Sequence, residues 1–174
     1  NGCVLHYVAN TGKARDGDLV LIDAGAEYRN YAADITRTFP VNGRFSKEQR
    51  ALHDLVGAAQ AAARACARPG VPWLAIHDAA VEALTEGLLR LGLLKGSLEK
   101  CIAGEHYRQF YRHKSGHWLG LDVHDVGDYR IDGESRLLEP GMVLTIEPGL
   151  YVAADDKAVH AKWRGIGIRT EDDV

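Results

Sequence analysis

Two stretches near the start of the chain have the hydrophobic pattern of β-strands. The first is the apolar run from Leu19 to Ile22, and the second extends from Ala32 to Val41. In the second stretch two sets of residues alternate, namely Ile35, Arg37 and Phe39 with Asp34, Thr36 and Thr38. Alternation with period two is typical of a half-buried strand. Because Tyr28-Arg29-Asn30 has turn character, we predict an antiparallel hairpin with a short loop.

A helical repeat occupies the middle of the chain. Ser46 with Gln49 three positions later forms a capping box, so a helix is predicted from Lys47 to about Arg68, before Pro69-Gly70. A second helix is predicted from Pro72 or Trp73 to about Leu91, and a short one from Ser97 to Ala103. The second helix carries apolar residues at helical spacing, which we expect to be buried: Ile76, Ala80, Leu84 and Leu88.

The last third of the chain returns to strand patterns. Strands are predicted from His117 to Asp125, from Met142 to Glu147 and from Gly165 to Asp172, with a turn at Pro140-Gly141. Strand pairs on either side of a helical middle favour an α+β domain with antiparallel strands.

Composition narrows the class of protein. A length of 174 residues predicts one domain, and the net charge of -3 argues against a nucleic-acid partner. No apolar run is long enough to span a membrane, and Asn1 to Asn10 do not have the pattern of a signal peptide. The odd set Cys3, Cys66 and Cys101 predicts reduced thiols in a cytoplasmic protein. Because the chain lacks a starting Met, we expect it to be a piece of something longer.

Four carboxylates lie at the ends of apolar strand segments, which we expect to be buried. Asp23 ends the first strand, and a hairpin symmetric about Tyr28 and Arg29 would place Asp34 opposite it, with Cβ atoms about 5 Å apart. Glu147 and Glu171 end two later strands. Like charges at such a distance repel, so about two divalent cations are needed to neutralise them. An oxygen-rich site suits manganese, cobalt or zinc better than copper.

Histidines are concentrated in the same part of the sequence. His113, His117 and His124 lie within one short segment and predict a functional cluster beside the acidic strand ends. The remaining histidines carry less information. We expect His53, His77 and His160 at the surface, whereas His106 fits either environment.

The order of these residues resembles a known family. Asp23, Asp34, His117, Glu147 and Glu171 match the Asp-Asp-His-Glu-Glu series of the pita-bread metallopeptidases. The local motifs also match over nearly the whole chain: Leu21 to Gly25, Asp34 to Pro40, His117 to Asp125, Thr145 to Gly149 and Arg164 to Arg169. Among these enzymes, the sequence is most similar to the bacterial Xaa-Pro aminopeptidases.

The resemblance implies a fold and a mechanism. The fold would be a curved antiparallel sheet covered by helices, in which residues 1–174 form a metallopeptidase catalytic domain that is incomplete at both ends. The first part of that domain and the separate N-terminal domain of these enzymes would be absent from residues 1–174. A metal-bridging hydroxide would hydrolyse the N-terminal Xaa-Pro bond of a peptide and release the N-terminal amino acid. The cofactor would be two divalent ions, with Mn2+ first and Co2+ or Zn2+ as alternatives. A homo-oligomer is implied for the longer protein.

The resemblance also implies a role for each residue. Asp23 would bind one ion, and Asp34 and Glu171 would bridge both ions. His117 and Glu147 would bind the second ion. Glu147 would also shuttle a proton. His6, His113 and His124 would line the substrate pocket and stabilise the tetrahedral intermediate. Arg169 and Tyr151 would orient the carboxylate ligands. Lys114 departs from the glycine that is usual after the matched histidine.

Three other functions share this fold. A prolidase would have the same ligands but cleave only Xaa-Pro dipeptides, and Trp118 after His117 favours the aminopeptidase. A non-catalytic peptide-binding module belongs to a different class, and its members have typically lost metal ligands. A creatinase-like amidinohydrolase works without metals, so the complete ligand series argues against it.

Overall fold

The computed structural model describes residues 2–174. Short strands flank a pair of long helices, in agreement with the α+β architecture that the sequence predicts. The strands are β1 (Leu19–Ala24), β2 (Glu27–Tyr28), β3 (Tyr31–Ala32), β4 (Ile35–Pro40), β5 (Arg130–Ile131), β6 (Glu134–Ser135), β7 (Thr145–Ile146), β8 (Gly149–Tyr151), β9 (Gly167–Arg169) and β10 (Asp172–Asp173). The helices are α1 (Lys47–Cys66), α2 (Trp73–Arg90), α3 (Leu98–Ala103), and the 3-10 turns η1 (His106–Gln109) and η2 (Ala161–Trp163).

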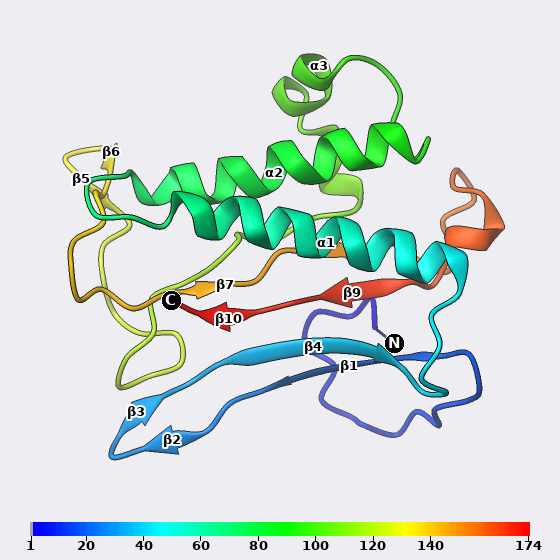
Figure 1. Cartoon of the computed structure of the whole chain (residues 1–174), viewed down its shortest axis with the longest axis horizontal. Coiled ribbons are helices and arrows are strands. Elements are labelled where there is room, and N and C mark those ends of the chain that lie inside the picture. Colours follow the sequence, from blue (N-terminus) through cyan, green and yellow to red (C-terminus); the bar gives the residue numbers. More distant parts are fainter. Residues whose placement is uncertain (1) are drawn as a thin grey trace.

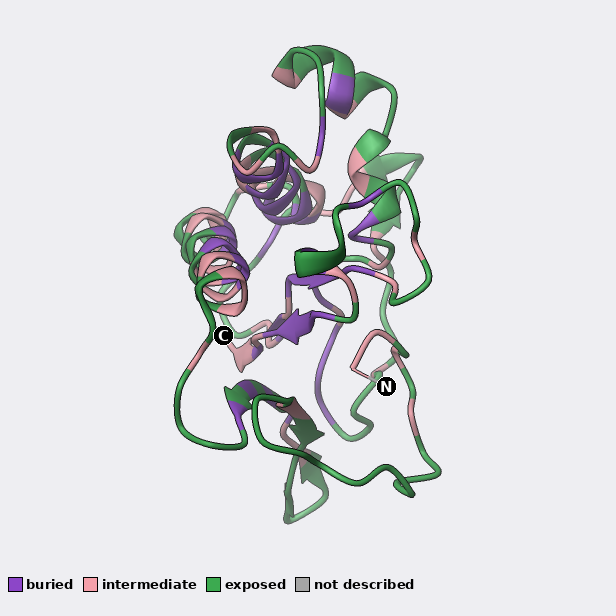
Figure 2. Ribbon diagram, turned by 90° about the vertical axis from the view of Figure 1, so that its right-hand side faces the viewer, coloured by how far each residue is buried: buried purple, intermediate pink, exposed green. Residues whose placement is uncertain are grey.

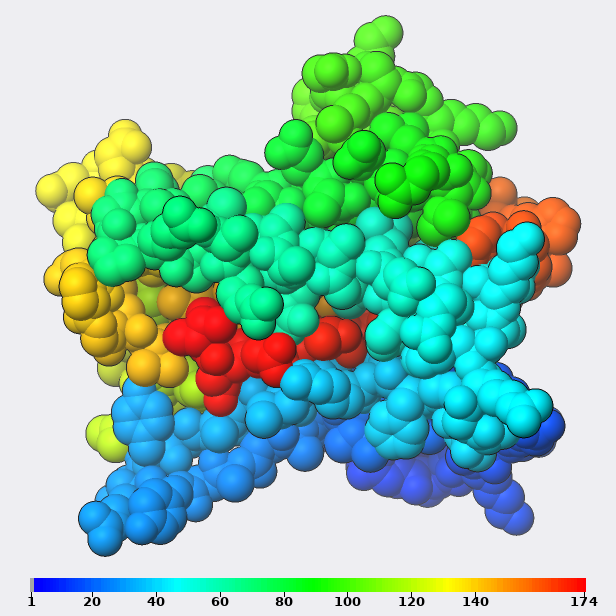
Figure 3. Space-filling view, viewed as in Figure 1, coloured from blue at the N-terminus to red at the C-terminus, as the bar shows by residue number. Residues whose placement is uncertain are grey.

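The molecule is built in layers (Figure 1). Helices α1 and α2 lie side by side over β7, β9 and β10, and the long curved hairpin of β1 and β4 lies on the other side of these strands. All strand pairs are antiparallel. An isolated bridge between Thr36 and Glu171 joins the hairpin to the C-terminal strands. In Figure 3 the C-terminal residues form a narrow band between α1 and the hairpin.

The hydrophobic core lies between the helices and the C-terminal strands. The predicted stripe of Ile76, Ala80, Leu84 and Leu88 on α2 is buried, as expected. The inward faces of both helices and of β8 and β9 are buried, while much of the hairpin is exposed (Figure 2). The two helices approach closely at Gly87, where a Cβ would lie 2.1 Å from Cδ1 of Leu55. The capping box is present, since the Ser46 hydroxyl accepts a hydrogen bond from the Gln49 amide.

The register of the hairpin differs from the prediction. Asp23 pairs with Thr36 and not with Asp34, because the turn is centred on Arg29-Asn30 and not on Tyr28 and Arg29. Arg29 and Asn30 have φ values of 52° and 66°, which is the geometry of a type I′ turn. Moving the centre of the turn by one residue shifts the register by two residues. A shift of two keeps each side chain on its predicted face, so Asp23 and Asp34 both still line the same cavity.

The predicted strand from His117 to Asp125 is wrong. Only Trp118 makes a strand bridge, to Leu144, and the chain then bends into a loop. The amide of Asp125 donates back to the carbonyl of Trp118, which closes the loop. Two other strands are shorter than predicted: Met142 to Glu147 reduces to β7, and Gly165 to Asp172 divides into β9 and β10.

Two expectations from composition can be compared with the described residues. Within residues 2–174, no helix combines the length and the apolar character that crossing a membrane requires. The three cysteines are free, as predicted.

Candidate metal centre

The predicted functional residues line one cavity of about 340 Å³. The cavity is lined by Asp23, Asp34, His117, Glu147 and Glu171, and also by His6, His113, His124, Arg169, Leu5, Lys114, Gly116 and Tyr129. The structure therefore brings together all the predicted metal ligands and pocket histidines. Of the predicted residues, only Tyr151 does not line the cavity, and it lies behind Arg169 and His113.

Each carboxylate is held at the end of a strand or between two strands. Asp23 lies on β1, and Asp34 directly precedes β4. Glu147 follows β7, while Glu171 lies between β9 and β10 and bridges to Thr36. The side chains meet because the hairpin crosses the C-terminal strands at this bridge.

His117 directs one ring nitrogen at three of these carboxylates. Its Nε2 lies 3.5 Å from Asp34 Oδ2, 3.7 Å from Glu147 Oε1 and 3.9 Å from Glu171 Oε1. The other nitrogen, Nδ1, lies 3.1 Å from the carbonyl oxygen of Trp118. A carbonyl only accepts, so Nδ1 carries a proton and Nε2 is the ring nitrogen directed at the carboxylates. Nε2 is therefore the nitrogen that is placed to bind a metal ion.

The carboxylate of Glu171 is oriented by β4. The Thr36 hydroxyl donates to Glu171 Oε2 at 2.6 Å. The other oxygen, Oε1, is buried and has no hydrogen-bond partner among the described residues. A buried unpaired carboxylate oxygen is costly, and a cation would satisfy it. Atoms of Asp34, His117 and Glu171 lie within 4.8 Å of one another, which is a separation that one ion can bridge.

Arg169 is the buried cation behind the carboxylates. Its guanidinium donates to Asp23 Oδ2 at 2.5 Å, to the Tyr151 hydroxyl at 3.1 Å and to the Thr36 hydroxyl at 3.2 Å. With Arg169 as one positive charge against four ionised carboxylates, the cluster would still carry three negative charges. One divalent ion leaves one of these charges unbalanced, whereas two divalent ions neutralise all three.

The pKa values of the carboxylates show the cost of this crowding. Burial, followed by repulsion from Glu171, raises the pKa of Glu147 to about 8. Burial also raises the pKa of Glu171 to about 7, with Asp34 and Asp23 contributing. The pKa of Asp34 rises to about 6 through burial and the neighbouring Asp23. In the absence of metal, protons on these carboxyl groups would therefore relieve the repulsion that divalent cations could relieve instead. A donor set of carboxylate oxygens and one imidazole nitrogen suits such cations.

The remaining histidines flank the carboxylates. His113 Nε2 lies 2.9 Å from the Tyr151 hydroxyl, and its Nδ1 lies 3.7 Å from Glu147 Oε2. Burial lowers the pKa of His113 to about 4, so this ring is neutral near pH 7. His124 packs edge-on against His117 with ring centroids 4.4 Å apart, and His6 lines the cavity from the N-terminal segment.

Two expectations about burial were wrong. Asp23 was expected at a buried strand end, but its side chain is 42% exposed and forms an ion pair with Arg169. His77 was expected at the surface, but it is buried on α2 and contacts the Ser115 hydroxyl. His160 and His106 are exposed, and His53 is half-buried.

The residues that hold the carboxylates were not predicted from the sequence. Thr36 and Thr38 form hydrogen bonds with Glu171 and Arg169, and Asp173 accepts from the amide of Asp34. A signal for the threonines was present, because they alternate with Ile35, Arg37 and Phe39. A polar residue on the inward face of a strand requires a partner there.

Comparison with known proteins identifies the family. The chain matches metallopeptidase family M24 over residues 1–174. It is 54% identical over its whole length to the Xaa-Pro aminopeptidase of Escherichia coli (strain K12) and covers 39% of that protein. It is 51% identical to the Xaa-Pro aminopeptidase of Haemophilus influenzae and covers 40% of it.

Solved structures give the same result for the fold. The aminopeptidase PepP of Pseudomonas aeruginosa matches all of the chain with a TM-score of 0.99 and 57% identity, and the chain covers 39% of it. A variant of Escherichia coli aminopeptidase P in complex with substrate matches 99% of the chain with a TM-score of 0.95. The chain thus spans about two fifths of these relatives, and the predicted pita-bread fold is confirmed. Since the family match extends from the first residue to the last, the chain belongs to metallopeptidase family M24.

Proposed function

We propose that residues 1–174 form part of the catalytic domain of a metal-dependent Xaa-Pro aminopeptidase. The observation that carries the proposal is the convergence of four carboxylates and Nε2 of His117 on one cavity lined by three further histidines. Relatives named Xaa-Pro aminopeptidase, at 54% and 51% identity, support the choice of reaction. The substrate would be a peptide with proline in the second position, and the product is the free N-terminal amino acid.

In this proposal five side chains hold two divalent ions, with Mn2+ as the first choice and Co2+ or Zn2+ as alternatives. These are Asp23, Asp34, His117, Glu147 and Glu171. When bound, the ions would polarise the scissile carbonyl and supply a hydroxide nucleophile near neutral pH.

The other chemistry falls to the chain's own side chains. Glu147 would take a proton from the attacking water and return it to the leaving amine. His113, His124 and His6 would line the substrate pocket and stabilise the tetrahedral intermediate. Arg169 and Tyr151 orient the carboxylate of Asp23 and the ring of His113 through their hydrogen bonds.

Peptide hydrolysis by the complete natural protein with Mn2+ tests this function. Ala-Pro-Ala, Ala-Ala-Ala and Ala-Pro are compared, with release of free alanine as the measurement. Rapid cleavage of Ala-Pro-Ala alone supports the proposal. Equal rates on the two tripeptides would remove the proline specificity, and cleavage of Ala-Pro but not Ala-Pro-Ala would indicate a prolidase. Binding of the peptides without cleavage would indicate a non-catalytic module.

A further inference from the structure

The segment from Phe110 to His117 carries two residues of the site but has no regular secondary structure. His113 and His117 both project from it into the cavity. Side chains at a catalytic site must be held to within about 0.5 Å, which a loop does not achieve without support. The contacts that hold this segment therefore determine where both rings lie.

A buried chain of three polar side chains links the segment to helix α2. The Ser115 hydroxyl lies 2.9 Å from Nδ1 of His77 and 2.6 Å from the Tyr111 hydroxyl. Ser115 and Tyr111 are each 1% exposed and His77 is 7% exposed, so water cannot replace these bonds. The Tyr111 ring in turn meets the ring of His113 edge-on, with centroids 5.0 Å apart.

The backbone of the same serine supports the metal centre from the other side. The amide of Glu147 donates to the carbonyl oxygen of Ser115 at 2.8 Å. Two residues further on, the amide of His117 donates to the Thr145 hydroxyl at 3.2 Å. Ser115 is thus the point where helix α2, the irregular segment and the end of β7 are joined.

A hydroxyl is required at this position if the neighbouring groups are to be satisfied. An apolar side chain at residue 115 would leave a buried histidine nitrogen and a buried phenol without this partner, and each loss is unfavourable. Repacking would relieve the loss by moving the segment, and His113 and His117 would move with it. A displacement of about 1 Å at a reacting group can cost a hundredfold in rate.

We infer that Ser115 is a positioning residue, whose hydroxyl, held between His77 and Tyr111, fixes the segment from which His113 and His117 reach the metal centre. This inference rests on the proposed function for its activity readout. Its metal-binding and exchange readouts are independent of that function.

The test uses four variants of the complete natural protein, namely three single variants and the double variant that combines Ser115→Ala with Tyr111→Phe. Ser115→Ala removes the central hydroxyl, and Tyr111→Phe removes only one partner and keeps the ring. The matched control is Thr85→Val, which removes a buried hydroxyl on helix α2, the helix that also carries His77. Among the described residues this hydroxyl donates to the Val81 carbonyl oxygen of the same helix. For each variant we would measure kcat and KM on Ala-Pro-Ala and the affinity for Mn2+ by titration calorimetry.

Ser115→Ala is expected to weaken Mn2+ binding about tenfold and to lower kcat about tenfold, with KM within twofold of the parent. Tyr111→Phe should show a smaller loss of the same kind, and the double variant should lose less than the product of the two single losses. In the metal-free protein, the amide of Glu147 should exchange with solvent faster in Ser115→Ala than in the parent or in Thr85→Val.

Parent-like kcat and Mn2+ affinity in Ser115→Ala would overturn the inference, and so would an equal loss in Thr85→Val. If Ser115→Ala does not fold, Tyr111→Phe decides by the same readouts. Failure of the parent protein to cleave any Xaa-Pro peptide would count against the proposed function alone, because Mn2+ affinity and amide exchange still test the role of Ser115.

Discussion

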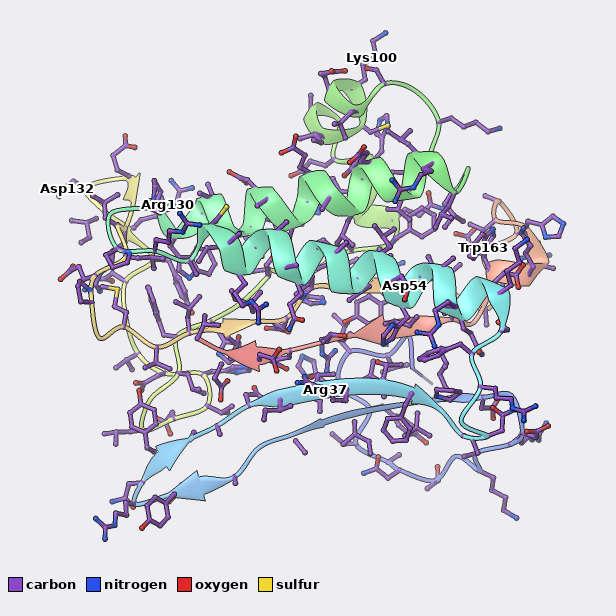
Figure 4. All side chains as sticks on the ribbon, viewed as in Figure 1. Arg37, Asp54, Lys100, Arg130, Asp132 and Trp163 are labelled. Atoms are coloured by element: carbon purple, nitrogen blue, oxygen red, sulfur yellow. The ribbon has the colours of Figure 1, made fainter. Side chains whose placement is uncertain are left out.

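Nε2 of His117 lies 3.5 Å from Oδ2 of Asp34, although one residue comes from an irregular segment after the helices and the other from the hairpin before them. The contact exists because Thr36 and Glu171 bridge the hairpin to the C-terminal strands. Arg37, labelled in Figure 4, reinforces this junction by donating to the carbonyl oxygen of Glu171 and to Asp172.

Addition of Mn2+ should stabilise the protein, and more so as the pH rises. The folded pKa values of Asp34, Glu171 and Glu147, about 6, 7 and 8, exceed their ordinary values. The metal-free fold is therefore favoured by their protonation below about pH 4 and loses that stability as the pH rises through 6 to 8. The cation binds the ionised forms. We expect about 2.7 kcal/mol of stabilisation at a hundredfold excess of free ion over its Kd, in thermal melts at pH 5 to 8. An unchanged Tm at saturating Mn2+ would contradict a shared metal centre.

Glu147→Ala and His124→Ala should separate metal binding from the chemistry around it. Glu147→Ala removes a predicted ligand and the proton carrier, so turnover of Ala-Pro-Ala should be abolished. His124→Ala should lower kcat roughly a hundred- to a thousandfold while the metal content stays near that of the parent. Metal analysis of both purified variants provides the comparison. A loss of metal in His124→Ala would instead place this ring among the ligands.

Thr36→Val and Thr38→Val form a matched pair on the inward face of β4. Each removes one buried hydroxyl and should lower the free energy of unfolding by about 1–3 kcal/mol. Only Thr36 donates to a carboxylate of the centre, Glu171, whereas Thr38 bonds to the backbone of Arg169. Thr36→Val should therefore weaken Mn2+ binding about tenfold, and Thr38→Val should leave it near the parent value. Equal Mn2+ affinities in the two variants would refute the role given to Thr36.

His77→Gln should reduce the fall in the free energy of unfolding as the pH is lowered from 7 to 4. Burial lowers the pKa of His77 to about 4, below the value of about 6.5 expected in the unfolded chain. The neutral ring therefore contributes stability that is present above pH 6.5 and lost as the pH falls towards 4. The slope is at most about 1.4 kcal/mol per pH unit for one proton. Urea denaturation between pH 4 and 7 measures it, with exposed His160→Gln as the control. Identical slopes in His77→Gln and the parent would show that this histidine does not couple to folding.

Local sequence determined the helices and the chemistry of the site. Ser46 and Gln49 close the capping box, and apolar spacing identified the buried face of α2, because both depend on contacts within a few residues. The same holds for the choice of carboxylate and imidazole side chains at strand ends. These residues also carried the resemblance to the family to which the chain belongs.

Contacts between distant segments decided the hairpin register and the bend after Trp118, which the hydrophobic pattern did not predict. The two positive φ values at Arg29 and Asn30 set the hairpin register, so that Asp23 pairs with Thr36. The predicted strand after His117 bends because Asp125 returns to Trp118, leaving Leu121 and Val126 exposed. Hydrophobic alternation alone does not distinguish such a loop from a strand, since the difference lies in whether a partner strand is present.

The sequence by itself thus determined which residue types could hold metal ions and where the helices would form. The tertiary structure decided their arrangement: Asp23 hydrogen-bonded to Arg169, Glu171 oriented by Thr36, and His77 buried against Ser115. The physical reason is that burial and hydrogen bonding of these groups come from segments far apart in the chain. A residue's own neighbours in sequence do not specify which of those segments will enclose it.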